Sequence, residues 1–262
     1  MELKDKCVVV TGGANGIGAA LCRRFAAEGA RAIVVADLDA ANARAVAREV
    51  GGIPAPLDVR RPDAIAALIE RVEQETAPID LFCSNAGIAV AGGPETSDAE
   101  WTACFEVNVM AHVWAARALV PRMLARGGGT LLNTCSAAGL LTQIGSASYS
   151  VTKHAAVGFA EWLAITYGGQ GLKVSALCPQ AVRTQMTAGT EGGGVAGVNG
   201  MMEPPEVAEA VVRGLREERF HILPHPEVHE YVLRKASDID RWIGGMQRLQ
   251  ARFSPDGMHA KT

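Results

Sequence analysis

The chain has 262 residues, of which 25 are Lys or Arg, 28 are Asp or Glu and 48% are apolar, and its net charge is −3. This balance is typical of a globular protein with a sizeable core, and it argues against nucleic acid as a partner because there is no run of basic residues. No stretch reaches the roughly 18 apolar residues of a membrane-spanning helix, and the first residues do not resemble a signal peptide. We therefore expect a cytoplasmic protein with no membrane partner.

Short apolar runs alternate with longer helical stretches along most of the chain. This alternation is typical of repeated strand–helix–strand units, which form a parallel sheet with helices on both faces. The predicted strands, in chain order, are residues 7–11, 32–36, a run ending near 57, and residues 79–83, 130–135, 174–178 and 220–223. The predicted helices are residues 16–28, 40–50, 62–75, 100–126, 148–167 and 206–216, with a helical tail over 225–253.

The chain contains no linker rich in Pro or Ser and no repeat at a solenoid period. We predict one α/β domain over residues 1–262, a Rossmann-type doubly wound parallel sheet. The glycine-rich residues 187–200 break the pattern, and we expect a flexible substrate lid over 187–203, with a disordered insertion as the alternative.

Residues 225–253 are predicted to form a C-terminal helical extension. Within it, Trp242, Met246 and Leu249 recur at helical spacing with arginines between them. We interpret this face as packing on the domain or on a second subunit rather than on a membrane surface.

A glycine-rich loop over residues 11–18 separates the first predicted strand from the first helix. Gly12, Gly16 and Gly18 permit a tight turn and let backbone N–H groups approach a pyrophosphate at the helix N-terminus. Asp37 ends the second strand, near the offset at which an acidic side chain binds the ribose hydroxyls of NAD. The alternatives are a plain glycine-rich turn and a helix-capping aspartate.

Tyr149 and Lys153 lie four residues apart in a predicted helix, so both side chains project from one face. We expect the nearby ammonium to lower the pKa of the phenol from about 10, as proton transfer near neutral pH requires. Ser136 ends the fifth predicted strand, at the edge of the sheet where such folds bind ligands. These three side chains are expected to converge.

Taken together, these motifs resemble the classical short-chain dehydrogenase/reductase family over roughly residues 4–220. The loop at 11–18, the segment Ser84-Asn-Ala-Gly87, and the segment at 178–184 resemble the family's cofactor motifs. Ser84 and Gln180 depart from the Asn and Gly usual at those positions, and the helical tail departs from the usual family ending. The resemblance implies four catalytic residues: Asn108, Ser136, Tyr149 and Lys153.

The resemblance also implies the roles of these residues. Tyr149 is expected to act as general acid/base on the substrate oxygen, and Lys153 to bind the nicotinamide ribose. Ser136 is expected to hold the substrate oxygen, and Asn108 to support a proton relay through water. NAD is the implied cofactor, with these expected binding residues: Gly12, Asn15, Gly16, Ile17, Gly18, Asp37, Leu38, Asp58, Val59, Asn85, Ala86, Gly87, Tyr149, Lys153, Pro179, Val182 and Thr184.

NAD is preferred to NADP in this interpretation because Asp37 would repel a 2′-phosphate, and Leu38 and Asn15 supply no basic neighbour. The expected substrate residues are Ser136, Ala138, Gln143, Tyr149 and Met186. Since residues 137–148 contain no Arg or Lys, we predict a small, mainly apolar, uncharged alcohol or ketone. We expect no metal site, since His225 and His229 lack a visible third ligand.

The leading hypothesis is an oxidoreductase that transfers a hydride between NAD and a secondary alcohol or ketone. An NADPH-dependent ketone reductase and a non-catalytic dinucleotide sensor are the alternatives. The Ala-rich and apolar faces of the predicted helices at 100–126 and 148–167 favour burial against a second subunit, as in a homodimer or homotetramer.

Overall fold

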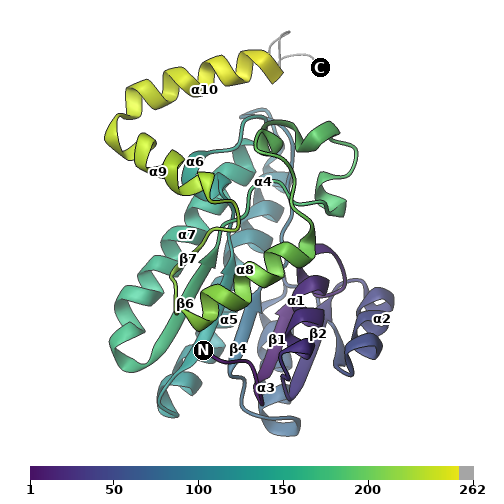
Figure 1. Ribbon diagram of the computed structural model, residues 1–262. Helices are drawn as coiled ribbons and strands as arrows, with labels where there is room; N and C mark the ends of the chain where they lie inside the picture. The colour runs from purple at the N-terminus through teal and green to yellow at the C-terminus, as the bar shows by residue number, and fades with distance from the viewer. Residues whose placement is uncertain (254–262) are drawn as a thin grey trace.

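The computed structural model describes residues 1–253 and contains one parallel sheet between two layers of helices (Figure 1). In the described chain, seven strands pair in the order β3-β2-β1-β4-β5-β6-β7, and each pairing is parallel. The strand order reverses between β1 and β4, which opens a crevice at the carboxyl ends of the strands. The predicted doubly wound Rossmann-type sheet is therefore confirmed. The strands are β1 (Cys7–Thr11), β2 (Ala32–Asp37), β3 (Ile53–Pro56), β4 (Leu81–Ser84), β5 (Gly129–Thr134), β6 (Leu172–Leu177) and β7 (His221–Ile222).

The helices cover both faces of the sheet because successive strand residues point to opposite sides. Val8 and Val10 pack in the core on the side of α1, α2 and α8, whereas Val9 packs on the side of α3, α5 and α7. The helices are α1 (Gly16–Ala27), α2 (Ala40–Val50), α3 (Pro62–Glu75), α4 (Asp98–Phe105), α5 (Ala111–Ala125), α6 (Ala138–Leu141), α7 (Ala147–Tyr167), α8 (Pro204–Arg216), α9 (Glu227–Ser237) and α10 (Ile239–Phe253). No helix of the described residues is both long and apolar enough to cross a membrane.

The structure adds to or corrects three predictions about the helices. The helix predicted over 100–126 is helical throughout residues 98–125, but it contains a π-helical turn, η1 (Glu106–Met110), between α4 and α5. The short helix α6 was not predicted at all. The helical tail is broken at Asp238, whose backbone is extended (φ −158°, ψ 96°) and whose side chain accepts a hydrogen bond of 2.9 Å from the N–H of Arg241. Asp238 thus ends α9 and caps the start of α10.

The segment between β6 and α8 is irregular, as its glycine content predicts. It contains two short 3-10 turns, η3 (Gln185–Thr187) and η4 (Glu191–Gly197). Three glycines inside η4 have positive φ, namely Gly192, Gly193 and Gly194. Because positive φ is costly for other residues, these glycines permit the tight path of the chain. In Figure 1, α10 runs across the top of the molecule, above α6 and beside this segment, and η4 and α10 are in contact.

Candidate active site

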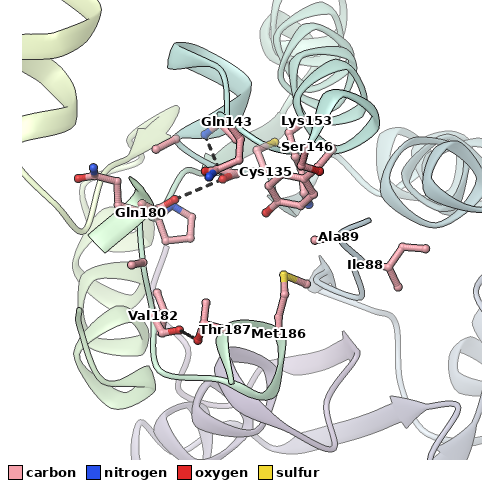
Figure 2. A pocket seen from close by; sticks show the side chains of 18 of the residues that line it. Ile88, Ala89, Cys135, Gln143, Ser146, Lys153, Gln180, Val182, Met186 and Thr187 are labelled. Carbon is pink, nitrogen blue, oxygen red and sulfur yellow. Dashed lines mark hydrogen bonds between the residues drawn. The ribbon is translucent and has the colours of Figure 1, made fainter. Parts of the chain in front are cut away.

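A cleft of about 1770 Å³ opens at the carboxyl ends of the strands. It extends from Asp37, at the end of β2, to Leu249 on α10. Figure 2 shows Gln143 and Lys153 on one side of the open centre and Met186 and Val182 on the other. Every predicted substrate residue lines this cleft, and so do the predicted cofactor residues apart from Gly18.

The glycine-rich loop is shaped by contacts that only glycine permits. Gly12 has φ +63°, and a Cβ there would lie 2.8 Å from the Cα of Ala86. A Cβ on Gly18 would lie 2.0 Å from the carbonyl oxygen of Gly12, so Gly18 supports the loop from beneath. The N-terminus of α1 has no side-chain cap, because Asn15 makes no capping hydrogen bond. The free N–H groups above this glycine cradle fit the diphosphate of a dinucleotide.

Asp37 and its neighbours form the end of the cleft nearest β2 and β3. The carboxylate of Asp37 accepts hydrogen bonds from the N–H groups of Ala14 (3.0 Å) and Asp39 (2.9 Å). Leu38 is 70% exposed beside it. Asp58 also lines this end and forms an ion pair of 2.7 Å with Arg60, which lowers the pKa of the Asp58 carboxyl. Arg60 also lines this end of the cleft, and the sequence analysis did not include it among the site residues.

Asn85 braces the sheet beneath the cofactor motifs. Its side-chain amide donates to the carbonyl oxygen of Thr11 (3.1 Å), and its Oδ1 accepts from the hydroxyl of Thr134 (3.1 Å). These bonds tie β1, β4 and β5 together at their carboxyl ends. The replacement of the usual Asn by Ser84 therefore leaves the brace intact.

Tyr149 and Lys153 both face the cleft from the first turns of α7, as their spacing predicts. The ammonium of Lys153 donates a hydrogen bond of 2.8 Å to the carbonyl oxygen of Thr134 and lies 5.7 Å from the centre of the Tyr149 ring. Ser136 lines the same cleft, and its hydroxyl oxygen accepts from the N–H of Ala138 at 3.0 Å. The three predicted side chains therefore converge on one space.

The pKa values of these side chains depend mainly on burial. Burial raises the pKa of Tyr149, and a hydrogen bond with Ser136 opposes that rise. Burial also lowers the pKa of Lys153. In this structure the pKa of Tyr149 is thus raised overall, because loss of hydration dominates. The lowering of that pKa by Lys153 stays a prediction.

Asn108 lies in the π-helical turn and is fully buried, so it does not line the cleft. Its Oδ1 accepts from the N–H of Ile88 (3.0 Å), and its amide donates to the carbonyl oxygen of Ile88 (2.9 Å) and to the hydroxyl of Thr152 (3.1 Å). From the π turn, Asn108 thus links the loop after β4 to α7. A Cβ on Gly87 would lie 3.3 Å from Oδ1 of Asn108 and 3.5 Å from Nζ of Lys153, so glycine keeps this space open.

Gln180, where the family usually has Gly, adopts no glycine-only conformation. Among the described residues, positive φ outside glycine occurs only at other positions. The N–H of Gln180 donates to Nδ1 of the buried His225 (3.1 Å), whose Nε2 has no hydrogen-bond partner among the described residues. Its side-chain amide donates to Oδ1 of Asn199 (3.4 Å), which also accepts from the hydroxyl of Tyr231 (3.2 Å). Gln180 thus links the loop after β6 to residues 187–203 and to α9.

The C-terminal helices form the outer wall of the cleft, which sequence reasoning did not predict. The apolar face of α10 borders the cleft through Trp242, Met246 and Leu249. Three arginines from α9 and α10 also line it, outside the stretch 137–148 on which the expectation of an uncharged substrate was based. The helical spacing at 242–249 was visible in the sequence, but spacing alone does not say which surface a helix face covers. These wall residues are Tyr231, Arg234, Ser237, Arg241, Trp242, Gly245, Met246, Arg248 and Leu249.

Comparisons with known proteins agree with this geometry. A family model described as short chain dehydrogenase matches residues 6–192. The chain is 34% identical, over 254 residues, to 1-deoxy-11-beta-hydroxypentalenate dehydrogenase of Streptomyces exfoliatus; the match covers 93% of this chain and 91% of the relative. It is 38% identical, over 193 residues, to galactitol 2-dehydrogenase (L-tagatose-forming) of Cereibacter sphaeroides, with 71% and 75% covered.

A solved structure gives the same picture of the fold. The crystal structure of a short chain dehydrogenase/reductase from Burkholderia phymatum, in complex with NAD, matches with a TM-score of 0.83 and 27% identity. The match covers 92% of this chain and 96% of that one. The similarity therefore extends through nearly the whole length of both proteins.

Proposed function

Because the chain belongs to the short-chain dehydrogenase family of oxidoreductases, which bind a nicotinamide dinucleotide, we propose that it transfers a hydride between NAD and a secondary alcohol or ketone. The observation that carries the proposal is the convergence of Ser136, Tyr149 and Lys153 on the cleft that the glycine cradle borders. The names of the relatives, a hydroxypentalenate dehydrogenase and a galactitol 2-dehydrogenase, support an alcohol as substrate.

In this proposal the protein orients the substrate and moves one proton. Bound NAD supplies the hydride acceptor. The hydroxyl of Ser136 holds the substrate oxygen, and the phenol oxygen of Tyr149 takes the proton from it during oxidation and returns it during reduction. Lys153 binds the nicotinamide ribose, and Asn108 supports a relay of the proton through water in the space beside Gly87.

The preference for NAD rests on the carboxylate of Asp37. It offers charge-assisted hydrogen bonds to the adenosine ribose hydroxyls, and it would repel a 2′-phosphate. Arg60 is the basic residue that lines this end, and its guanidinium already pairs with Asp58, which reduces the attraction that it offers to a phosphate. The NADPH-dependent reductase is the weaker alternative for this reason.

Residues 187–203 act as the substrate lid in this proposal. Met186, directly before the segment, lines the cleft, and Val195 and Val198 border it from within the segment. Closure of such a loop over bound substrate excludes water and can limit turnover.

We further propose that the chain assembles as a homodimer or homotetramer through α4 and α7. Large apolar side chains are exposed there: Phe105 on α4 is 43% exposed, and on α7 Trp162 is 53% and Ile165 is 77% exposed. Burial of such a face against a second copy removes it from water. Sedimentation analysis at micromolar concentration tests this, and a monomer contradicts it.

A turnover screen tests the proposed function. The protein is assayed with NAD and NADP against a panel of aliphatic and aromatic secondary alcohols, and with NADH and NADPH against the matching ketones. Reduction of NAD by members of the panel supports the proposal. Tight dinucleotide binding without turnover of any alcohol or ketone favours the sensor, although such a protein has no evident need for Tyr149 and Lys153.

A further inference from the structure

Three arginines without acidic partners line the outer wall of the cleft. Arg234 lies on α9, and Arg241 and Arg248 lie on α10. Within residues 1–253, no carboxylate forms an ion pair with any of the three, whereas Arg60, at the other end of the cleft, is paired with Asp58. The outer wall therefore carries positive charge that the described part of the protein does not neutralise locally.

The carboxylates that line the cleft lie at its opposite end. They are Asp37 and Asp58, which follow β2 and β3 at one edge of the sheet. The arginines come from helices that follow β7, at the other edge. The cleft is thus acidic at the proposed adenosine end and basic at the end formed by the C-terminal helices.

Two of the guanidinium groups lie close to residues of their own helices. The guanidinium of Arg234 lies 5.7 Å from the centre of the Tyr231 ring, in a cation–π contact. The guanidinium of Arg248 lies back along α10, where a Cβ on Gly244 or Gly245 would be 3.6 or 3.8 Å from its nitrogens.

The surface between the arginines is apolar. Trp242, Met246 and Leu249 line the cleft from the same helix as Arg241 and Arg248. Such a wall suits a molecule with a hydrocarbon body and one anionic group, because a guanidinium binds a carboxylate through two parallel charge-assisted hydrogen bonds.

From these observations we infer that Arg234, Arg241 and Arg248 form an anion-binding subsite, and that the substrate is a hydroxy acid or keto acid. Its carboxylate lies away from the carbon that is oxidised or reduced, and its apolar body contacts α10. This inference rests on the proposed function for the reacting end of the substrate. A charged substrate replaces the uncharged one expected from residues 137–148, because the arginines that would bind it lie on α9 and α10.

A matched pair of ketones tests the subsite. The probes are 4-oxocyclohexanecarboxylate and 4-oxocyclohexanecarboxamide, which have similar shape and differ in charge. Their dissociation constants are measured by calorimetry on the full chain saturated with NAD, where no reduction occurs. The measurement compares three proteins: the wild type, the triple variant Arg234→Gln/Arg241→Gln/Arg248→Gln, and the control Arg252→Gln. The control changes an arginine of α10 that lies outside the cleft lining.

The wild type and Arg252→Gln are expected to bind the carboxylate at least ~10-fold more tightly than the carboxamide, and added salt should reduce that preference. In the triple variant the preference should disappear, while carboxamide binding changes less than about twofold. No preference in the wild type, or a preference that survives the three substitutions, overturns the inference. Reduction of the carboxamide with NADH is measured separately, so failure of the proposed function is distinguished from failure of the subsite.

Discussion

The carboxylate of Asp37 accepts a hydrogen bond of 3.0 Å from the backbone N–H of Ala14, in the glycine-rich loop. The end of β2 and the cofactor loop after β1 are therefore held together by the side chain proposed to select the cofactor. The same carboxylate also accepts from the N–H of Asp39 at the start of α2. Asp37 thus has a fixed orientation at the cleft, which a ligand-binding carboxylate requires.

We predict a preference for NAD over NADP of at least ~100-fold in kcat/KM, equivalent to about 2.7 kcal/mol. Asp37→Ala should reduce that ratio mainly by weakening the use of NAD. Asp39→Ala is the control, because Asp39 caps α2 and does not line the cleft. Steady-state kinetics with both cofactors measure the ratio. Equal use of NAD and NADP by the wild type contradicts the role assigned to Asp37.

Ser136→Ala should shift the pH dependence of alcohol oxidation to higher pH. The hydrogen bond with Ser136 opposes the burial that raises the pKa of Tyr149, so its loss raises that pKa further. Oxidation needs the ionised phenol, so the acidic limb of the kcat/KM profile moves to higher pH together with the pKa of Tyr149. Loss of the hydroxyl that holds the substrate oxygen also lowers kcat by about 100-fold. Ser136→Thr keeps a hydroxyl and should retain the wild-type limb. An unchanged limb in Ser136→Ala would argue that Ser136 does not act on Tyr149.

His112 makes the protein sensitive to acid. It is buried on α5, neither ring nitrogen has a hydrogen-bond partner in the described chain, and burial lowers its pKa from 6.5 to about 3. The unfolded chain therefore binds a proton near pH 6.5 that the folded state does not bind. Stability is lost as pH falls below 6.5, by about 2 kcal/mol between pH 6.5 and pH 5 at 1.36 kcal/mol per unit.

His112→Leu should remove this part of the pH dependence and change stability at pH 7 by less than about 1 kcal/mol, because it replaces an unpartnered polar ring with an apolar side chain. Urea unfolding at pH 5, 6 and 7 measures the effect. His229→Leu, on the exposed side of α9, serves as control. An equally steep loss of stability in His112→Leu and the wild type would rule His112 out as the cause.

Asn199→Ala should loosen the proposed lid. Oδ1 of Asn199 accepts hydrogen bonds from Gln180 and Tyr231, which hold residues 187–203 against the loop after β6 and against α9. Amide exchange over 187–200 should become about fivefold faster in the variant, in line with the loss of roughly 1 kcal/mol of hydrogen bonding. Gln74→Ala, on the exposed face of α3, is the control. In the wild type, cofactor with a substrate analogue should slow this exchange, and unchanged rates would favour a plain insertion.

Local pattern was enough to predict the sheet and much of the cleft. Alternation of apolar runs with helical stretches predicted the parallel order, because the central strands β1, β4 and β5 are buried on both faces. The glycine loop and the pair Tyr149 and Lys153 were predictable because their chemistry depends on short spacings within one turn or one helix. The structure places both at the cleft.

What the sequence did not predict depends on contacts between distant parts of the chain. The apolar pattern of the helix does not reveal the π turn at Glu106–Met110, from which the side chain of Asn108 bonds to Ile88 and Thr152. Likewise, the amphipathic pattern of α10 predicted packing on the domain or on a second subunit. It did not predict that this face borders the cleft after the break at Asp238, with no residue of α10 fully buried. The basic outer wall of the cleft was not predicted, because the sequence does not show which surface α10 borders.

The pair of measurements on Tyr149→Phe tests the central claim most directly. NADH formation is followed with the best secondary alcohol of the panel, and the dissociation constant of NADH is determined for the same preparations. If Tyr149 transfers the proton while hydride passes to NAD, kcat falls by about 1000-fold or more and NADH affinity stays within about threefold of the wild type. Full alcohol oxidation by Tyr149→Phe would contradict the account.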